Sequence, residues 1–187
     1  MTAARRPPTT LPTTPPTTLP PHPAMLEPDT LMKQCTVEFG RASGPGGQHR
    51  NKVETAVTIT HTPTGVSASA TERRHQAQNR HEAIFRLRLR LARDVRRHVD
   101  PDRHQPSELW RTRRQGEKLP INPEHRDYPA LLAEALDVII ARGFDVAGAA
   151  GVLGITMSQL AKLIRHDKAT HALVNRGREE RGLHPLK

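Results

Sequence analysis

Residues 76 to 98 contain neither glycine nor proline, and this stretch constrains the fold more than any other part of the chain. Within it, FRLRLRL at 85–91 alternates with a period of two, which is typical of a strand. The whole stretch is longer than a usual strand, however, and Ile84, Leu87 and Leu91 continue to Val95 as an apolar stripe at helical spacing. We therefore predict one long helix, with arginines covering its remaining faces.

Three short segments ahead of this helix are predicted as strands. The first is CTVEF at 35–39, and the second is TAVTITH at 55–61, in which Val57 and Ile59 alternate with threonines. The turn sequence TPTG then leads into VSASAT at 66–71. Hydrophobic residues make up 35% of the chain and aromatic residues only 3%, so the core should be small and aliphatic.

The first thirty residues are rich in proline and threonine and have almost nothing to bury. We expect residues 1–30 to form a disordered tail, partly in polyproline II conformation. A plain tail, or a true start at Met25 or Met32, is one interpretation. A transit peptide is a second, since no acidic residue precedes Glu27, although the prolines oppose the amphipathic helix that such peptides need. A ligand for a proline-recognising domain is a third.

Residues 99–126 are predicted to be a polar connector, because prolines and one glycine interrupt them repeatedly. Residues 86–114 hold ten arginines against four acidic residues, on a chain of net charge +10 and pI about 10.9. A charge run is usually a solvated face, but this excess favours a phosphate-contacting surface. No apolar run is long enough to span a bilayer, and Cys35 has no second cysteine to pair with. We therefore expect a cytoplasmic protein with no membrane partner.

Residues 127–187 are predicted to be a separate helical domain. Pro129 suits the first turn of a helix through ALLAEALDVIIARG, and Asp145 can cap VAGAAGVL, which Gly154 closes. The capping box TMSQ opens a third helix, and Asp167 can cap a last one. Two short helices joined at a glycine resemble a helix-turn-helix, and a helical hairpin without a nucleic-acid role is almost equally favoured.

Between the first two predicted strands lies GPGGQHRNK, at residues 44–52. It lacks the G-x-x-x-x-G-K-[ST] pattern of a phosphate loop, and it does not open a helix as a dinucleotide-binding loop must. None of the eleven histidines shows metal-ligand spacing such as H-E-x-x-H. We therefore expect neither a metal ion nor a cofactor.

The wider pattern around this loop is much more specific. Arg41, Ser43, Gly44, Gly46, Gly47, Gln48, Asn51 and Lys52 are followed by TAVTITHTPTGV and then by ERRHQAQNRHEA. This ordered set, over about residues 33 to 92, resembles the catalytic domain of class I peptide chain release factors, and most closely the short, codon-independent members that rescue stalled ribosomes. The resemblance implies an α+β fold. Residues 31–98 would be a small domain of this Gly-Gly-Gln type, with a few-stranded sheet and a long helix, followed by the connector and the helix-turn-helix-like unit.

The resemblance also implies hydrolysis of the peptidyl-tRNA ester on the ribosome, with Gly46, Gly47 and Gln48 as the catalytic residues. Two adjacent glycines permit backbone angles and a close approach to RNA that a Cβ would oppose. They can aim the Gln48 backbone N–H at the oxygen that gains charge in the transition state. The Gln48 side chain can orient the attacking water, although a neutral amide is a poor general base.

The remaining site residues are predicted to contact RNA, as part of the loop or of the R-H-Q-x-x-N-R motif that follows. Two of them, Asn51 and Asn79, are equally well explained by turn or cap chemistry. For the second motif, direct RNA contact and bracing of the loop both remain open. The predicted RNA-binding set is Arg41, Ser43, His49, Arg50, Asn51, Lys52, Arg73, Arg74, Gln76, Asn79 and Arg80.

Two departures from the family limit this interpretation. Codon-reading release factors are much longer, so we do not expect stop-codon recognition. Rescue-type relatives often end in a very basic tail, whereas this chain ends in NRGREERGLHPLK after a helical unit. We expect a monomer whose partners are large-subunit ribosomal RNA and P-site peptidyl-tRNA. The alternative is a helix-turn-helix protein that binds DNA or RNA through residues 145–165 without hydrolase activity.

Overall fold

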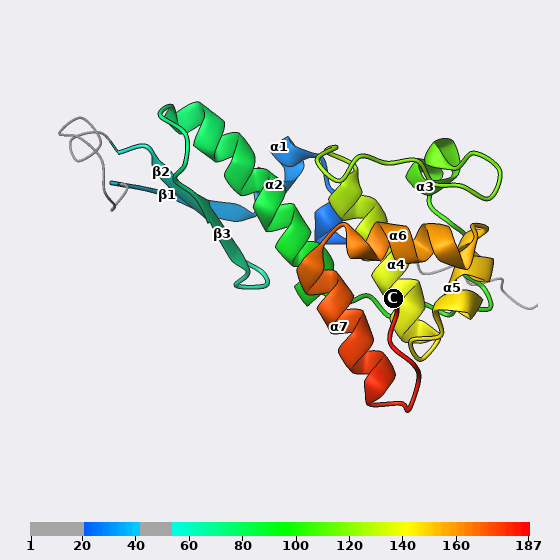
Figure 1. The fold of residues 1–187 in the computed structure, drawn as a ribbon. Coiled ribbons are helices and arrows are strands. Elements are labelled where there is room, and N and C mark those ends of the chain that lie inside the picture. Colours follow the sequence, from blue (N-terminus) through cyan, green and yellow to red (C-terminus); the bar gives the residue numbers. More distant parts are fainter. Residues whose placement is uncertain (1–20, 42–53) are drawn as a thin grey trace, which may run out of the picture.

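The computed structural model of the protein describes residues 21–41 and 54–187. Three antiparallel strands form a sheet in the order β1-β2-β3, and a long helix, α2, lies along one face of it (Figure 1). The strands lie within one residue of the predicted segments, which confirms the α+β interpretation. Their bounds are Cys35–Gly40 for β1, Ala56–His61 for β2 and Ser67–Ala70 for β3.

Helix α2 (Gln76–Asp94) covers the apolar face of the sheet. Val57 and Ile59 of β2 are fully buried, as are Leu87 and Leu91 of the helix. The FRLRLRL stretch is therefore helical, as its length and its apolar stripe predicted. The period-two alternation is accommodated because Arg86 and Arg90 turn towards the edge strand β3, where they donate hydrogen bonds to the carbonyls of Ser69 and Ser67.

Helix α2 ends at Asp94, four residues before the predicted end at 98. Val95 is already extended, and its carbonyl oxygen lies 3.0 Å from Nε2 of His22. The next residue, Arg96, donates a 2.8 Å hydrogen bond to Asp137. The helix therefore ends where distant parts of the chain hold residues 95–97. The sequence around this end contains no glycine or proline that would have predicted it.

The prediction of a tail through residue 30 is wrong for residues 21–30, while residues 1–20 lie outside the described part. Pro23–Met25 form a 3-10 helix, η1, and Pro28–Met32 form α1. His22 and Ala24 are completely buried, and Arg88 of α2 donates to the Ala24 carbonyl at 3.1 Å. Burial lowers the pKa of His22 to about 4, so the ring is neutral in the core.

The predicted connector, 99–126, is also more ordered than expected. It contains helix α3 (Glu108–Arg113), capped by the Ser107 hydroxyl. Trp110 is fully buried, and its Nε1 donates to the Leu153 carbonyl at 2.9 Å. The segment therefore packs against the helical unit as well as linking it to α2.

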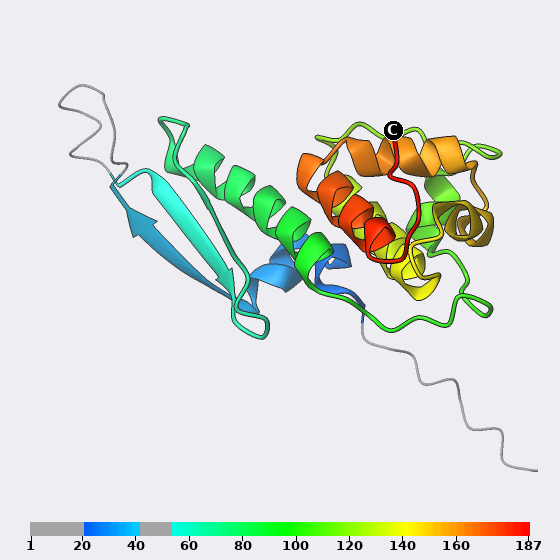
Figure 2. The same ribbon diagram turned by 60° about the horizontal axis from the view of Figure 1, so that its bottom comes forward.

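The helical unit consists of α4 (Tyr128–Ala141), α5 (Val146–Leu153), α6 (Met157–Arg165) and α7 (Lys168–Glu179). The predicted caps are confirmed, because Asp145, Thr156 and Asp167 each accept a backbone N–H in the first turn of their helix. Gly154 closes α5 with a φ of 69°, and α5 and α6 are inclined by 104° to each other. This pair has the outline of a helix-turn-helix (Figure 2).

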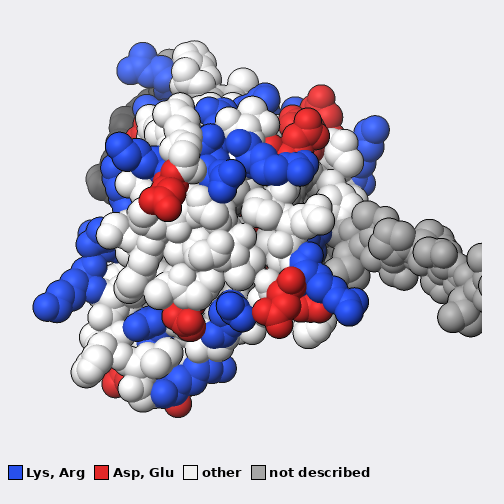
Figure 3. Space-filling view, turned by 90° about the vertical axis from the view of Figure 1, so that its right-hand side faces the viewer, with Lys and Arg blue, Asp and Glu red and all other residues white. Residues whose placement is uncertain are grey.

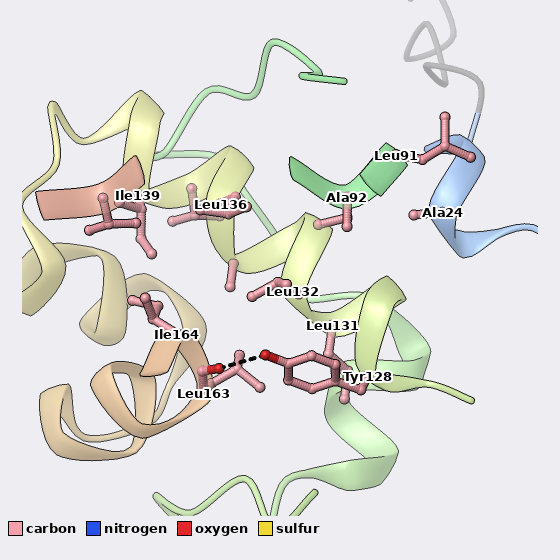
Figure 4. Packing of buried hydrophobic residues seen from close by; sticks show 14 of the residues in the cluster. Ala24, Leu91, Ala92, Tyr128, Leu131, Leu132, Leu136, Ile139, Leu163 and Ile164 are labelled. Atoms are coloured by element: carbon pink, nitrogen blue, oxygen red, sulfur yellow. Dashed lines mark hydrogen bonds between the residues drawn. The ribbon is translucent and has the colours of Figure 1, made fainter. Parts of the chain in front are cut away.

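One hydrophobic core joins the helical unit to the sheet domain. Helix α4 lies across the carboxyl-terminal part of α2 and also packs on α6. Figure 4 shows Ala92 of α2 near α4, whereas Leu91 lies on the side of Ala24. Tyr128 reaches across this core and donates a 3.0 Å hydrogen bond to the Leu163 carbonyl. The two predicted domains are therefore in extensive contact.

Many arginines of the 86–114 run hold the structure together. Arg86, Arg93, Arg96 and Arg113 pair with Glu72, Asp167, Asp137 and Asp127. The run therefore supplies intramolecular contacts in addition to any phosphate contacts. Basic side chains remain frequent on the surface, and Figure 3 shows them around an area without charged side chains at the end of the helical unit.

Asp167 links α7 to α2 and provides a test of this link. Arg93 Nη1 lies 3.1 Å from both Asp167 carboxylate oxygens, and Thr170 donates to the same carboxylate through its N–H and its hydroxyl. Burial alone would raise the pKa of Asp167, but the bonds from Thr170 and Arg93 outweigh it and hold the pKa below the ordinary 3.8.

Asp167→Asn should lower the free energy of unfolding by about 1 to 2 kcal/mol at neutral pH, because it removes a charged cap and an ion pair. Since the folded-state pKa is depressed, this contribution is present above pH 3.8 and is lost as the pH falls below it. Urea unfolding at a series of pH values measures the difference in the free energy of unfolding between wild type and variant. Asp102→Asn, at an exposed ion pair, is the control. If the difference in the free energy of unfolding stayed constant down to pH 2, the stabilising role given to the Asp167 carboxylate would be contradicted.

Among the residues described, no single helix is both long and apolar enough to cross a membrane, and only the bent α5–α6 pair reaches the required length and composition when its two helices are combined.

Candidate functional site

The candidate site lies where β1 and β2 meet residues 42–53. Gly40 pairs with Ala56 in the last position of the β1–β2 ladder, so the two ends of the intervening segment start side by side. In Figures 1 and 2 this end of the sheet is the one farthest from helices α4 to α7. Eight predicted site residues lie outside the described part of the chain: Ser43, Gly46, Gly47, Gln48, His49, Arg50, Asn51 and Lys52.

Residues 54 and 55, which join this segment to β2, are called the foot of the loop. Asn79, in the first turns of α2, fixes the backbone there. Its side chain is fully buried, and its amide nitrogen donates to the carbonyl of Thr55 at 2.7 Å and to that of Arg73 at 2.9 Å. Its side-chain oxygen accepts the Arg73 N–H at 2.9 Å. The Asn79 amide thus connects Thr55, just before β2, with Arg73, in the segment between β3 and α2. Asn79 is occupied with contacts inside the protein.

Gln76 holds the neighbouring position from one helical turn earlier. Its Nε2 donates to the Glu54 carbonyl at 3.0 Å, next to the carbonyl held by Asn79. At the other end of the loop, Arg41 Nε lies 3.9 Å from the Glu54 carboxylate, but both side chains are exposed and such a pair adds little stability. The amides of Gln76 and Asn79 are therefore the main braces at the foot of the loop.

The arginines of the same motif behave differently. Arg73, Arg74 and Arg80 are exposed, and none of them forms an ion pair with an acidic residue in the described ranges. Arg73 also borders a shallow surface groove of about 420 Å³, lined in addition by Ala77, Gln78, His81 and Glu82. The motif therefore divides into two braces and three cations that are free to contact a partner.

His81 and Gln78 were not among the predicted site residues. His81 directly follows Arg80, and Gln78 lies inside the R-H-Q-x-x-N-R motif at one of its variable positions. The signal that could have identified them is helical geometry, since residues 77, 78 and 81 share one face of α2 at spacings of three and four.

The described part of the site offers hydrogen bonds and positive charge. Among residues 21–41 and 54–187, no cluster of three His, Cys, Asp or Glu side chains could hold a metal ion. The site instead combines a hydrogen-bonded foot with exposed guanidinium groups. Guanidinium groups pair well with phosphate oxygens, so this end of the molecule suits contact with a nucleic-acid backbone.

Comparison with known proteins identifies the family. The profile of the RF-1 domain matches residues 27–128, from the residue before α1 to the first residue of α4. The chloroplastic peptide chain release factor PrfB1 of Arabidopsis thaliana is 54% identical over 55 residues, which cover 29% of this chain and 12% of the relative. Peptide chain release factor 1 of Symbiobacterium thermophilum is 46% identical over 72 residues, which cover 37% of this chain and 20% of the relative. Peptide chain release factor 2 of Paramagnetospirillum magneticum is 50% identical over 58 residues, which cover 31% of this chain and 16% of the relative.

These matches span no more than a fifth of each of these relatives, and the profile ends where the helical unit begins. The shared region includes the sheet, α2 and the loop between β1 and β2. Because the matched domain occupies more than half of the sequence, the chain belongs to the class I peptide chain release factor family.

Proposed function

We propose that this protein hydrolyses the ester bond of peptidyl-tRNA on the ribosome, and does so without reading a stop codon. The observation that carries the proposal is the position of Gly46-Gly47-Gln48 between two paired strands, with the foot of the second strand held by Gln76 and Asn79. The names of the related proteins, all peptide chain release factors, support the reaction class.

In this proposal the loop residues act by position. Gly46 and Gly47 let the backbone approach the ester closely, and the Gln48 N–H stabilises the developing oxyanion. The Gln48 side chain orients the water that attacks the ester carbonyl. The bond between the carbonyl carbon and the ribose oxygen breaks. The water oxygen stays on the released peptide as a carboxylic acid, and the ribose oxygen takes up a proton to become a hydroxyl.

The surrounding cations hold the protein on RNA. Arg41, Arg50 and Lys52 belong to the loop, and Arg73, Arg74 and Arg80 stand next to its foot. Ser43, His49 and Asn51 can hydrogen-bond sugars or bases. Asn79 and Gln76, by contrast, serve as positioning residues, because their amides bind the backbone of Thr55 and Glu54. The partners in the proposal are large-subunit ribosomal RNA and P-site peptidyl-tRNA, and the protein acts as a monomer.

A release assay tests the proposal. Ribosomes carrying labelled peptidyl-tRNA on truncated, intact or absent mRNA are mixed with the protein, and free peptide is measured. We expect release without dependence on a stop codon in the A site. Gln48→Ala should slow release about a hundredfold, since it removes the side chain that orients water but keeps the backbone N–H. Release only at a stop codon would refute codon independence, and no effect of Gln48→Ala would refute the assigned role of the loop.

A further inference from the structure

A groove on the helical unit lies far from the loop and outside the RF-1 match. It has a volume of about 410 Å³ and runs between α6 and the last residues of the chain. One wall is α6, through Met157, Ser158, Ala161 and Arg165, and the other wall is formed by residues 184–187 together with Arg178 of α7. This volume lies in the range of small-ligand sites.

Hydrogen bonds to main-chain atoms fix the second wall of the groove. Arg165 donates to the main-chain oxygen of Lys187, the last residue, at 2.7 Å, and Arg178 donates to the His184 carbonyl oxygen at 2.7 Å. Asn175 accepts the Leu186 N–H at 2.7 Å. Residues 184–187 therefore lie along α6.

The charged side chains that line the groove are all basic. Its lining includes Arg165, Arg178 and Lys187, with His184 beside them, and the lining contains no aspartate or glutamate. Arg178 donates to two main-chain carbonyl oxygens, which orients it and leaves its positive charge without a carboxylate side-chain partner within the part of the chain described, whereas Arg165 donates to the main-chain oxygen of the last residue. Oriented arginines without acidic partners are suited to bind phosphate.

The two walls of the groove also present apolar side chains. Met157 is 43% exposed, which is unusual for a large hydrophobic side chain in this protein, and Ala161, Pro185 and Leu186 lie beside it. A nucleotide presents the same combination, because its base has an apolar face and its phosphate a negative charge. The groove is therefore complementary to a nucleotide in both charge and polarity.

We propose that this groove binds a nucleotide of single-stranded RNA, with a base against Met157 and the phosphate between Arg165, Arg178 and Lys187. That the natural RNA is ribosomal rests on the proposed function, whereas nucleotide binding at the groove does not. The groove is a second RNA contact, separate from the loop, and it gives the helical unit a function of its own on the ribosome.

Two pairs of variants with matched charge changes test the groove. Met157→Glu adds an acid to the α6 wall of the groove at the first position of α6, where a negative charge suits the helix dipole, so the fold should be retained. Its control is Ala169→Glu, which adds an acid to the first turn of α7 at an exposed position outside the groove. Lys187→Glu reverses a charge inside the groove, and its control, Arg176→Glu, reverses an exposed charge on the other side of α7 from Arg178.

Binding of a fluorescent 12-nucleotide single-stranded RNA is measured by anisotropy over a range of salt concentrations. Met157→Glu and Lys187→Glu should each weaken binding roughly three- to tenfold, and Lys187→Glu should lower the salt slope by about one, while both controls stay within about twofold of wild type. Equal binding by groove variants and controls would overturn the proposal, as would tighter binding of a 12-base-pair DNA duplex or no RNA binding by wild type.

The same variants separate this inference from the proposed hydrolysis. In the release assay, Met157→Glu should raise the factor concentration needed for half-maximal release and leave the maximal rate unchanged, whereas Gln48→Ala should lower the maximal rate. If wild type releases no peptide, the proposed function fails, and the anisotropy comparison still decides the groove.

Discussion

Replacing Gly47 by valine should reduce peptide release at least about a thousandfold while ribosome binding stays close to wild type. A valine side chain would deny the backbone the angles that glycine permits and would push the Gln48 N–H away from the developing oxyanion. Loss of one oxyanion donor alone accounts for a hundred- to thousandfold effect in other enzymes, roughly 3 to 4 kcal/mol. Single-turnover release, measured with the factor in excess over ribosomes, reports the maximal rate directly.

Gly40→Val is the matched control for this substitution. Gly40 is the last residue of β1, a Cβ built there would meet nothing within 4 Å, and its φ is not in the left-handed range. Valine favours strands, so the control should fold normally and release peptide at a rate near that of wild type. Gly46→Val should behave like Gly47→Val. If Gly47→Val bound ribosomes and released peptide as fast as Gly40→Val, the role given to the loop backbone would be wrong.

Asn79→Ala should slow peptide release about a hundredfold although Asn79 itself is buried. The substitution removes the three hydrogen bonds that fix Thr55 and Arg73, so the foot of the loop would no longer be held in one position. It should also cost about 2 to 4 kcal/mol in the free energy of unfolding, because buried main-chain groups lose their partners. Urea denaturation and single-turnover release measure the two effects separately.

Arg80→Ala provides the contrast, since Arg80 is adjacent in sequence but exposed and without an ion pair in the described residues. Its loss should weaken RNA binding and leave both stability and the maximal release rate nearly unchanged. Asn79→Asp keeps the acceptor for the Arg73 N–H but sets a buried carboxylate oxygen against the carbonyl oxygens of Thr55 and Arg73, so its release rate should be at least as low as that of Asn79→Ala. A purely structural Asn79 would lower stability without changing release by the folded protein.

The hydrophobic periodicity of the sequence and its helix-capping and turn residues were enough to predict most of the strands and helices. The threonine–aliphatic alternation around Val57 and Ile59 gave β2, and the acidic and hydroxyl caps at Asp145, Thr156 and Asp167 gave the starts of three helices. These features are local, and therefore visible in short windows of sequence.

The parts that were missed depend on contacts between distant residues. His22 and Ala24 lie next to a proline-rich run, and only their burial against α2 makes that segment part of the core. Trp110 anchors a segment with many breakers by binding the carbonyl of Leu153, 43 residues further along the chain. Nothing in the sequence near Val95 indicates that α2 ends there.

The set of candidate site residues remains a prediction, but for the part of the second motif that the structure describes, the contacts of each side chain can be compared. The sequence placed Gln76, Asn79 and the neighbouring arginines in one motif and left RNA contact and bracing open for all of them. The structure separates them by burial and by partner, because Asn79 and Gln76 bind backbone carbonyls while Arg73, Arg74 and Arg80 face outwards. The roles of residues 42–53 remain predictions.

Helix α2 has 19 residues, which gives it a length of about 28 Å, and it separates the loop-bearing end of the sheet from the helical unit. Asp167 pairs with Arg93 in the last turn of α2, and Asp137 pairs with Arg96 just beyond it, so the helical unit is tied to this end of α2. Under the two proposals above, the loop and the groove would contact RNA at a fixed spacing, and an inserted helical turn in α2 would change that spacing by about 5 Å, which should weaken simultaneous binding at both places.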